Sequence, residues 1–82
     1  MMLFRCTNTF ETREGGVPRT VDEGGVWFKL RHVHVAGGYE CADLEQVRDG
    51  VFTGDVARVR LSRLSDDFET IPLKDVSTHL LQ

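Results

Sequence analysis

The chain has 82 residues, with 10 lysines and arginines against 13 aspartates and glutamates, a formal net charge of −3, and 40% hydrophobic residues. This length allows one small domain over residues 1–82 and excludes a large cofactor fold such as a complete doubly wound sheet. The hydrophobic fraction excludes a disordered chain. The acidic balance argues against non-specific binding of nucleic acid, for which a strongly basic chain is usual.

Two expectations concern location. No stretch approaches the roughly 18 consecutive apolar residues of a membrane span, so we expect no membrane association. The first ten residues lack the apolar core of a signal peptide. This predicts a cytoplasmic location, where Cys6 and Cys41 would stay reduced.

Glycine pairs punctuate the chain and separate segments rich in valine, threonine and aromatic residues, a pattern typical of antiparallel strands. The first strand is predicted over residues 2–10, with Phe4, Cys6 and Phe10 on one face. The stretch 11–24 is polar, and we expect a long loop there.

Residues 26–35 make up the longest predicted strand. The apolar parity changes at Val33, so we expect a bulge or bend near residues 31–32. The pair Gly37-Gly38 then predicts a hairpin turn into a strand over residues 39–47. In the first part of the long strand, one face carries Val26, Phe28 and Leu30, and the other carries Trp27, Lys29 and Arg31.

The second half of the chain contains shorter predicted elements. A turn at Asp49-Gly50 precedes a strand over residues 55–61 and a helical turn over residues 63–68 that Ser62 would cap. A short strand follows over residues 70–73, and residues 74–82 form a C-terminal tail or short helix. With about five antiparallel strands and one or two short helical turns, the sequence predicts a mainly β fold, a small barrel.

Scattered apolar positions carry a resemblance to a known group. The pattern Phe4-x-Cys6, Phe10, Gly25-x-Trp27 and Leu61-Ser62 with Leu64 and Phe68 resembles short proteins of prophages and integrative conjugative elements. Several of those proteins look like SH3-type small barrels. The resemblance therefore implies an SH3-like barrel and a role as an accessory protein of a phage or mobile element, and it implies no catalytic residues.

The pattern His32-x-His34 is the sharpest chemical motif. On a regular strand both rings point to the same side, a spacing that zinc sites use, and Cys6, Cys41 or His79 could complete such a site. The alternative is that both histidines are partly exposed strand residues beside a bend. We expect no bound cofactor.

Enzymatic activity is not expected. The hairpin turn would place Cys41 beside His34, but the sequence indicates no oxyanion hole or pocket for nucleophilic catalysis. The glycine pairs lack the lysine and the strand–helix context of a phosphate-binding loop. The paired carboxylates of the chain are typical of solvated faces.

A binding role has more support. If Trp27 is exposed, it is a candidate interface anchor, and the alternative is that it packs under the 11–24 loop. The leading hypothesis is a module that binds a protein through an edge strand or the Trp27 surface, and a homodimer would cover such an edge. The runner-up is a nucleic-acid-binding barrel, if the strands carrying the arginines are neighbours. Cross-strand ion pairs are the plainer explanation of these charges. The candidate partner-binding residues are Trp27, Lys29, Arg31, Arg58 and Arg60.

Overall fold

The structure, a computed structural model, describes residues 3–72. In this part of the chain it contains seven strands and one short helix, which confirms the predicted mainly β class. In chain order the elements are β1 (Leu3–Cys6), β2 (Phe10–Thr12), β3 (Arg19–Val21), β4 (Val26–Ala36), β5 (Tyr39–Arg48), β6 (Val51–Arg60), α1 (Leu61–Asp66) and β7 (Phe68–Ile71).

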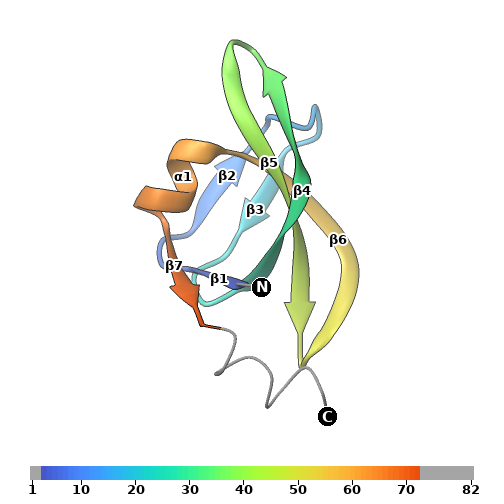
Figure 1. Ribbon diagram of the computed structural model, residues 1–82, viewed down its shortest axis with the longest axis vertical. Helices are drawn as coiled ribbons and strands as arrows, with labels where there is room; N and C mark the ends of the chain where they lie inside the picture. The colour runs from blue at the N-terminus through green and yellow to red at the C-terminus, as the bar shows by residue number, and fades with distance from the viewer. Residues whose placement is uncertain (1–2, 73–82) are drawn as a thin grey trace.

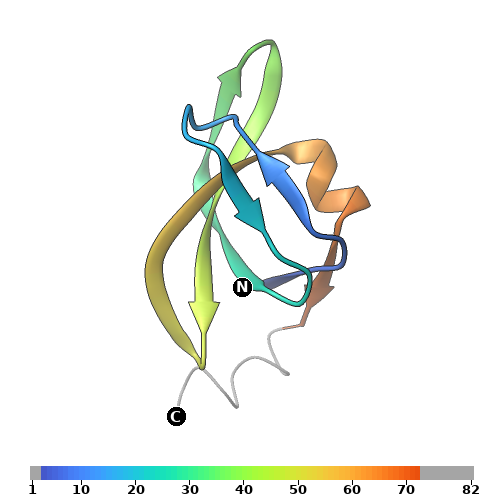
Figure 2. The ribbon, with the colours of Figure 1, turned by 180° about the vertical axis from the view of Figure 1, so that it is seen from behind.

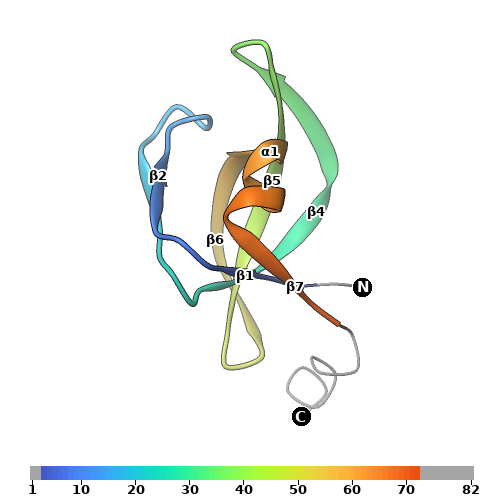
Figure 3. The same cartoon turned by 90° about the vertical axis from the view of Figure 1, so that its left-hand side faces the viewer.

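Five strands form one antiparallel sheet in the order β6-β5-β4-β1-β7, while β2 and β3 pair with each other in a second sheet (Figure 1). Figure 3 shows β2 on one side and β4 on the other, with β5, β6 and α1 between them. Thr12 in β2 donates a hydrogen bond from Oγ1 to the carbonyl oxygen of Arg58 in β6, at 2.5 Å. The small sheet therefore docks at the β6 edge. No strand ladder within residues 3–72 joins the two sheets, so strand pairing does not close the predicted barrel there.

The main core brings the two sheets together. Viewed from behind, the β2–β3 hairpin lies in front of the large sheet (Figure 2), and its Val21 is completely buried. A second, smaller cluster on the opposite face of the large sheet is built on Leu3 and Val47. The buried members of the main core are Cys6, Val21, Trp27, Ala42, Leu44, Ala57, Val59 and Phe68.

Both predicted hairpin turns are confirmed. Ala36 pairs with Tyr39, so Gly37 and Gly38 form a two-residue turn, and their φ angles are 59° and 84°. This left-handed backbone suits glycine, which has no Cβ to clash there. The turn between β5 and β6 at Asp49-Gly50 also has positive φ at both residues.

The predicted bulge in the longest strand is confirmed. The pairing of β4 with β5 shifts between Lys29 and Val33, where four residues of β4 advance against two of β5. Lys29 pairs with Leu44 and Val33 with Ala42, so the two β4 residues lie on the same face of the sheet. The extra residues bend β4 at the predicted position.

The N-terminal predictions are wrong in two places. The strand expected over residues 2–10 ends at Cys6, and residues 7–9 separate it from a second strand, β2, which pairs with β3 and not with the large sheet. The expected 11–24 loop contains most of the β2–β3 hairpin. These strands were missed because most of their side chains are exposed and polar, with only Thr12 and Val21 buried.

Three elements in the second half also have bounds that differ from the predictions, and one of them is β7, which covers Phe68–Ile71 where a strand over residues 70–73 was expected. Strand β6 begins at Val51 and passes through Gly54, whose φ of 86° accommodates a register shift against β5. Helix α1 begins at Leu61 with Arg60 as its N-cap, and no side chain caps it, so the predicted role of Ser62 is wrong. The tail or helix expected over residues 74–82 lies outside the described residues.

Helix α1 has six residues, and it covers the end of the main core. Its Leu64 packs against that core together with Phe68, as the sequence predicted, although Phe68 already belongs to β7. Among the residues that the structure describes, no helix has the length and apolarity needed to cross a membrane.

Candidate functional site

The most prominent candidate site is the side of β4 that faces away from β5. Strand β1 pairs with β4 only at Val26–Phe28, and within residues 3–72 no strand pairs with this side beyond Phe28. The β4–β5 hairpin projects past the rest of the sheet (Figure 1). We call residues 30–35 of β4 the open edge.

Exposed apolar side chains lie along the open edge. Val35 is 76% exposed and Val33 is about half exposed, and Tyr39 across the turn is also half exposed. The alternation of β4 carries Val33 onto the core side of the sheet, but here the strand has run beyond the core that would cover it. Two β-branched residues therefore border unpaired backbone, an arrangement that monomeric sheets usually avoid.

The charge of β4 is entirely basic. Between Val26 and Ala36 the strand contains Lys29, Arg31 and two histidines, and it contains no carboxylate. In the described part of the chain no ion pair includes Lys29 or Arg31. Lys29 donates only a long hydrogen bond, 3.5 Å, to the carbonyl oxygen of Leu30.

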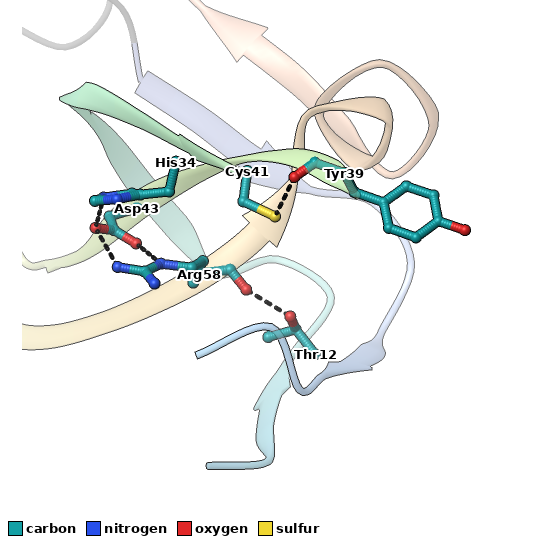
Figure 4. Close-up of polar contacts among 6 residues, drawn as sticks. All are labelled: Thr12, His34, Tyr39, Cys41, Asp43 and Arg58. Carbon is teal, nitrogen blue, oxygen red and sulfur yellow. Dashed lines mark hydrogen bonds and ion pairs between the residues drawn. The ribbon is translucent and has the colours of Figure 1, made fainter. Parts of the chain in front are cut away.

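A polar cluster supports the other face of the hairpin (Figure 4). Asp43 of β5 accepts hydrogen bonds from Arg58 of β6, with Nε at 2.8 Å and Nη2 at 3.4 Å. The Nε2 atom of His34 lies 2.9 Å from Oδ2 of the same carboxylate. The hydrogen bond from Arg58 is the main reason that the pKa of Asp43 is lowered, and His34 lowers it further. This cluster orients the His34 ring and connects β4, β5 and β6.

The structure places Cys41 opposite His34, as the sequence predicted. Its side chain is completely buried, and Sγ donates to the carbonyl oxygen of Tyr39 at 3.6 Å (Figure 4). The His34 ring, for its part, is held by Asp43. In these two hydrogen bonds the Cys41 thiol and the His34 ring therefore contact different groups. Cys6 is also a buried thiol, and burial raises its pKa.

The two histidines of the His-x-His pattern are neighbours, with ring centroids 6.5 Å apart. No group of three or more histidine, cysteine, aspartate or glutamate side chains within residues 3–72 is arranged to hold a metal ion. His79, a third potential ligand, lies outside those residues. The pair by itself supplies two ligands, while structural zinc sites use four.

The basic patch, which the sequence offered as a conditional alternative to cross-strand ion pairs, does not form. It required β4 and β6 to be neighbours, but β5 lies between them. Arg58 pairs with Asp43, and Arg60 pairs with Glu14 at 2.8 Å. Trp27 is only 4% exposed and packs in the main core, so of the two alternatives the buried one is correct. Lys29 and Arg31 are thus separated from Arg58 and Arg60 by β5, and Trp27 lies on their strand but is buried.

A second surface feature was missed by sequence reasoning. An open hollow of about 490 Å³ lies between the end of β2 and helix α1. Its arginines are all engaged by carboxylates, and two of them also stack on aromatic rings: Arg60 on Tyr39 at 3.7 Å and Arg63 on Phe10 at 4.6 Å. The sequence offered no signal for this hollow, because its lining comes from segments far apart in the chain. The lining residues are Glu11, Thr12, Arg13, Glu14, Arg60, Ser62, Arg63 and Asp66.

Comparisons with models of protein families, with curated proteins and with solved structures find no significant match to this chain. The resemblance to proteins of prophages and integrative elements, including its SH3-like fold, therefore stays a prediction.

Proposed function

We propose that this protein is a non-enzymatic binding module that takes an extended segment of a partner protein onto the open edge of β4. The observation that carries the proposal is the combination of unpaired strand backbone and exposed valines at residues 30–35. Strand addition of this kind uses main-chain hydrogen bonds for affinity and alternate side chains for specificity.

The shape of the β4–β5 hairpin supports this proposal. The hairpin projects past the rest of the sheet (Figures 1 and 2), and within residues 3–72 no strand pairs with the open edge. The contacts among Asp43, Arg58 and His34 hold the hairpin to β6 from the other side. A rigid edge of this kind reduces the ordering cost that binding would otherwise carry.

The absence of enzymatic activity is part of the proposal, and it is supported by the contacts of the chemically active groups. His34 and Arg58 both contact Asp43, and the Cys41 thiol is buried against a backbone carbonyl. The assignment to a phage or mobile element depends on the sequence resemblance alone. The cytoplasmic location is likewise an expectation from the sequence.

The proposal can be tested without a known partner. We would select binders from an mRNA-displayed library of random peptides of about ten residues, enough to cover a strand. Strand addition predicts that selected peptides shift the backbone amide resonances of residues 30–35. It also predicts that methylating alternate peptide nitrogens abolishes binding, because each methyl group removes a hydrogen-bond donor.

A matched pair of variants locates the site. Replacing Val33 and Val35 by serine should weaken peptide binding by about tenfold, since two apolar cross-strand contacts are lost. Val17→Ser is the control, because Val17 is similarly exposed, at 70%, but lies in the β2–β3 turn. Peptides that bind the wild type and the Val33→Ser/Val35→Ser variant equally well would contradict strand addition, and so would peptides that still bind after N-methylation.

A further inference from the structure

The charge pattern of β4 distinguishes it from the rest of the chain. The whole sequence has a net charge of −3, yet β4 contains two cations, two histidines and no carboxylate. Outside β4, nearly every described lysine or arginine is in an ion pair. The paired arginines are Arg5, Arg13, Arg19, Arg58, Arg60 and Arg63.

Three lysine or arginine side chains within residues 3–72 have no ion-pair partner, and two of them lie at the bulge of β4, one directly before it and one within it. These are Lys29 and Arg31, while the third, Arg48, lies at the far end of β5. Since six of the seven arginines described outside β4 pair with carboxylates, two unpaired cations together on a strand edge without a partner strand indicate that a carboxylate from elsewhere fits there.

The charge also changes along the edge. Lys29 and Arg31 lie at the end nearest the main body of the sheet, whereas Glu40 pairs with Val35 next to the hairpin turn. The register places Lys29 on the same face as Val33 and Val35, because Leu44, Ala42 and Glu40, their partners in β5, alternate along one strand, and Arg31 lies in the bulge between them. From the main body of the sheet toward the hairpin turn, the residues are therefore first basic, then apolar, and then acidic, with Glu40 on the neighbouring strand.

We infer that the segment bound at the open edge is acidic and has a fixed polarity. Its carboxylates lie opposite Lys29 and Arg31, and its apolar, β-branched residues lie opposite Val33 and Val35. This inference rests on the proposed function and adds the chemical class of the partner. Arg31 offers a guanidinium that can hold a carboxylate through two N–H groups, which favours aspartate or glutamate over a neutral residue.

The same peptide selection tests this inference separately from the proposed function. Peptides selected on the wild-type protein should be enriched in aspartate and glutamate over lysine and arginine, with the acidic residues clustered at one end. For a selected peptide, Arg31→Glu should weaken binding by about tenfold or more, because attraction becomes repulsion. Arg31→Gln should weaken it less, since it only removes the charge.

Arg48→Glu is the matched control, because it changes the net charge equally at an unpaired arginine away from the open edge. Arg48→Glu should leave the affinity for the peptide within about twofold of the wild-type value. If the net charge of the protein alone set the affinity, Arg48→Glu would weaken binding as much as Arg31→Glu does. The circular dichroism melting curve of each variant checks that the fold is intact.

Each result of the selection decides one point. An acidic bias with the Arg31→Glu loss supports the inference. Peptides that bind at residues 30–35 without an acidic bias, and equally well to Arg31→Glu, would overturn the inference while leaving strand addition in place. Recovery of no peptide that binds at the open edge would overturn the proposed function and the inference together.

Discussion

Arg58 and Asp43 are direct cross-strand partners in the register of β6 and β5, and Arg58 donates two hydrogen bonds to the Asp43 carboxylate. The side chain of Asp43 is only 18% exposed, and it also contacts His34 of β4. One carboxylate thus connects three strands at the base of the projecting hairpin. Asp43 therefore adds a side-chain connection to the backbone ladders that join β4, β5 and β6.

The first prediction concerns the stability contributed by Asp43. Asp43→Asn should lower the free energy of unfolding at neutral pH by about 1 kcal/mol, because charge-assisted hydrogen bonds become neutral ones. Since the pKa of Asp43 is lowered in the folded protein, its contribution is fully present above the ordinary aspartate pKa of about 4. It is lost as the pH falls through the lower folded pKa. Urea unfolding measured at neutral and acidic pH checks both points.

The difference between wild type and Asp43→Asn should therefore shrink at acidic pH. Some acid sensitivity should remain in the variant, because the pKa of Asp67 is also lowered, chiefly by Arg63. Glu69→Gln is the control, since the Arg5–Glu69 pair is about half exposed and should contribute little. A difference between wild type and Asp43→Asn that is constant down to low pH would contradict this account.

The second prediction concerns Trp27, the only tryptophan. Because Trp27 is buried in the main core, its fluorescence should be blue-shifted and poorly quenched by acrylamide. Trp27→Ala should destabilise the fold by about 3 to 5 kcal/mol, the usual cost of emptying a large core site. Trp27→Phe should cost less, because it keeps most of the ring volume and removes Nε1, which has no hydrogen-bond partner within residues 3–72.

Peptide binding separates this position from the open edge. Trp27→Phe should bind a selected peptide as well as the wild type does, since the ring does not reach the surface. Efficient acrylamide quenching, or loss of peptide binding in the folded Trp27→Phe protein, would instead indicate that Trp27 is an exposed anchor.

The sequence predicted those parts of the fold in which local pattern and global structure agree. The Gly37-Gly38 turn has a strong local signal, and the bulge in β4 lies where the apolar parity changes. Its two extra residues nevertheless leave Val33 on the opposite face from Val26 and Phe28, so the bulge does not bring the two apolar sets together as expected. The β2–β3 hairpin was missed because its burial depends on β6: Thr12 reaches the carbonyl oxygen of Arg58, 46 residues away. No window of sequence contains that contact.

The candidate site divides in the same way. Lys29 and Arg31 were identified from their position on a strand, and Lys29 directly precedes the open edge while Arg31 lies in it. Trp27 was the less accurate choice, because alternation tells which residues share a face but not which face is buried. Arg58 and Arg60 failed as candidates for a different reason, which is strand order. Strand β5 separates β4 from β6, and each arginine of β6 pairs with a carboxylate of its own.

The third prediction tests the docking of the small sheet. Thr12→Val preserves the shape of the side chain but removes its hydrogen bond to the Arg58 carbonyl oxygen, so it should lower the free energy of unfolding by about 1 kcal/mol. Thr20→Val is the control, because Thr20 in the paired strand β3 is exposed. Urea unfolding of both variants provides the comparison. An equal effect at the two positions would show that β propensity, not this hydrogen bond, sets the stability of the hairpin.

The last prediction addresses nucleic acid. Arg58 and Arg60 are held by Asp43 and Glu14, so phosphate groups would have to displace existing ion pairs to reach them. We therefore expect no binding of labelled single- or double-stranded oligonucleotides in fluorescence anisotropy, even at low salt, where phosphate contacts are strongest. Binding that weakens steeply with salt and disappears in Arg58→Glu/Arg60→Glu would favour a nucleic-acid-binding module instead. If Arg31→Glu abolished it and Arg58→Glu did not, the oligonucleotide would be acting as a polyanion at the open edge, where Lys29 and Arg31 have no carboxylate partner within residues 3–72.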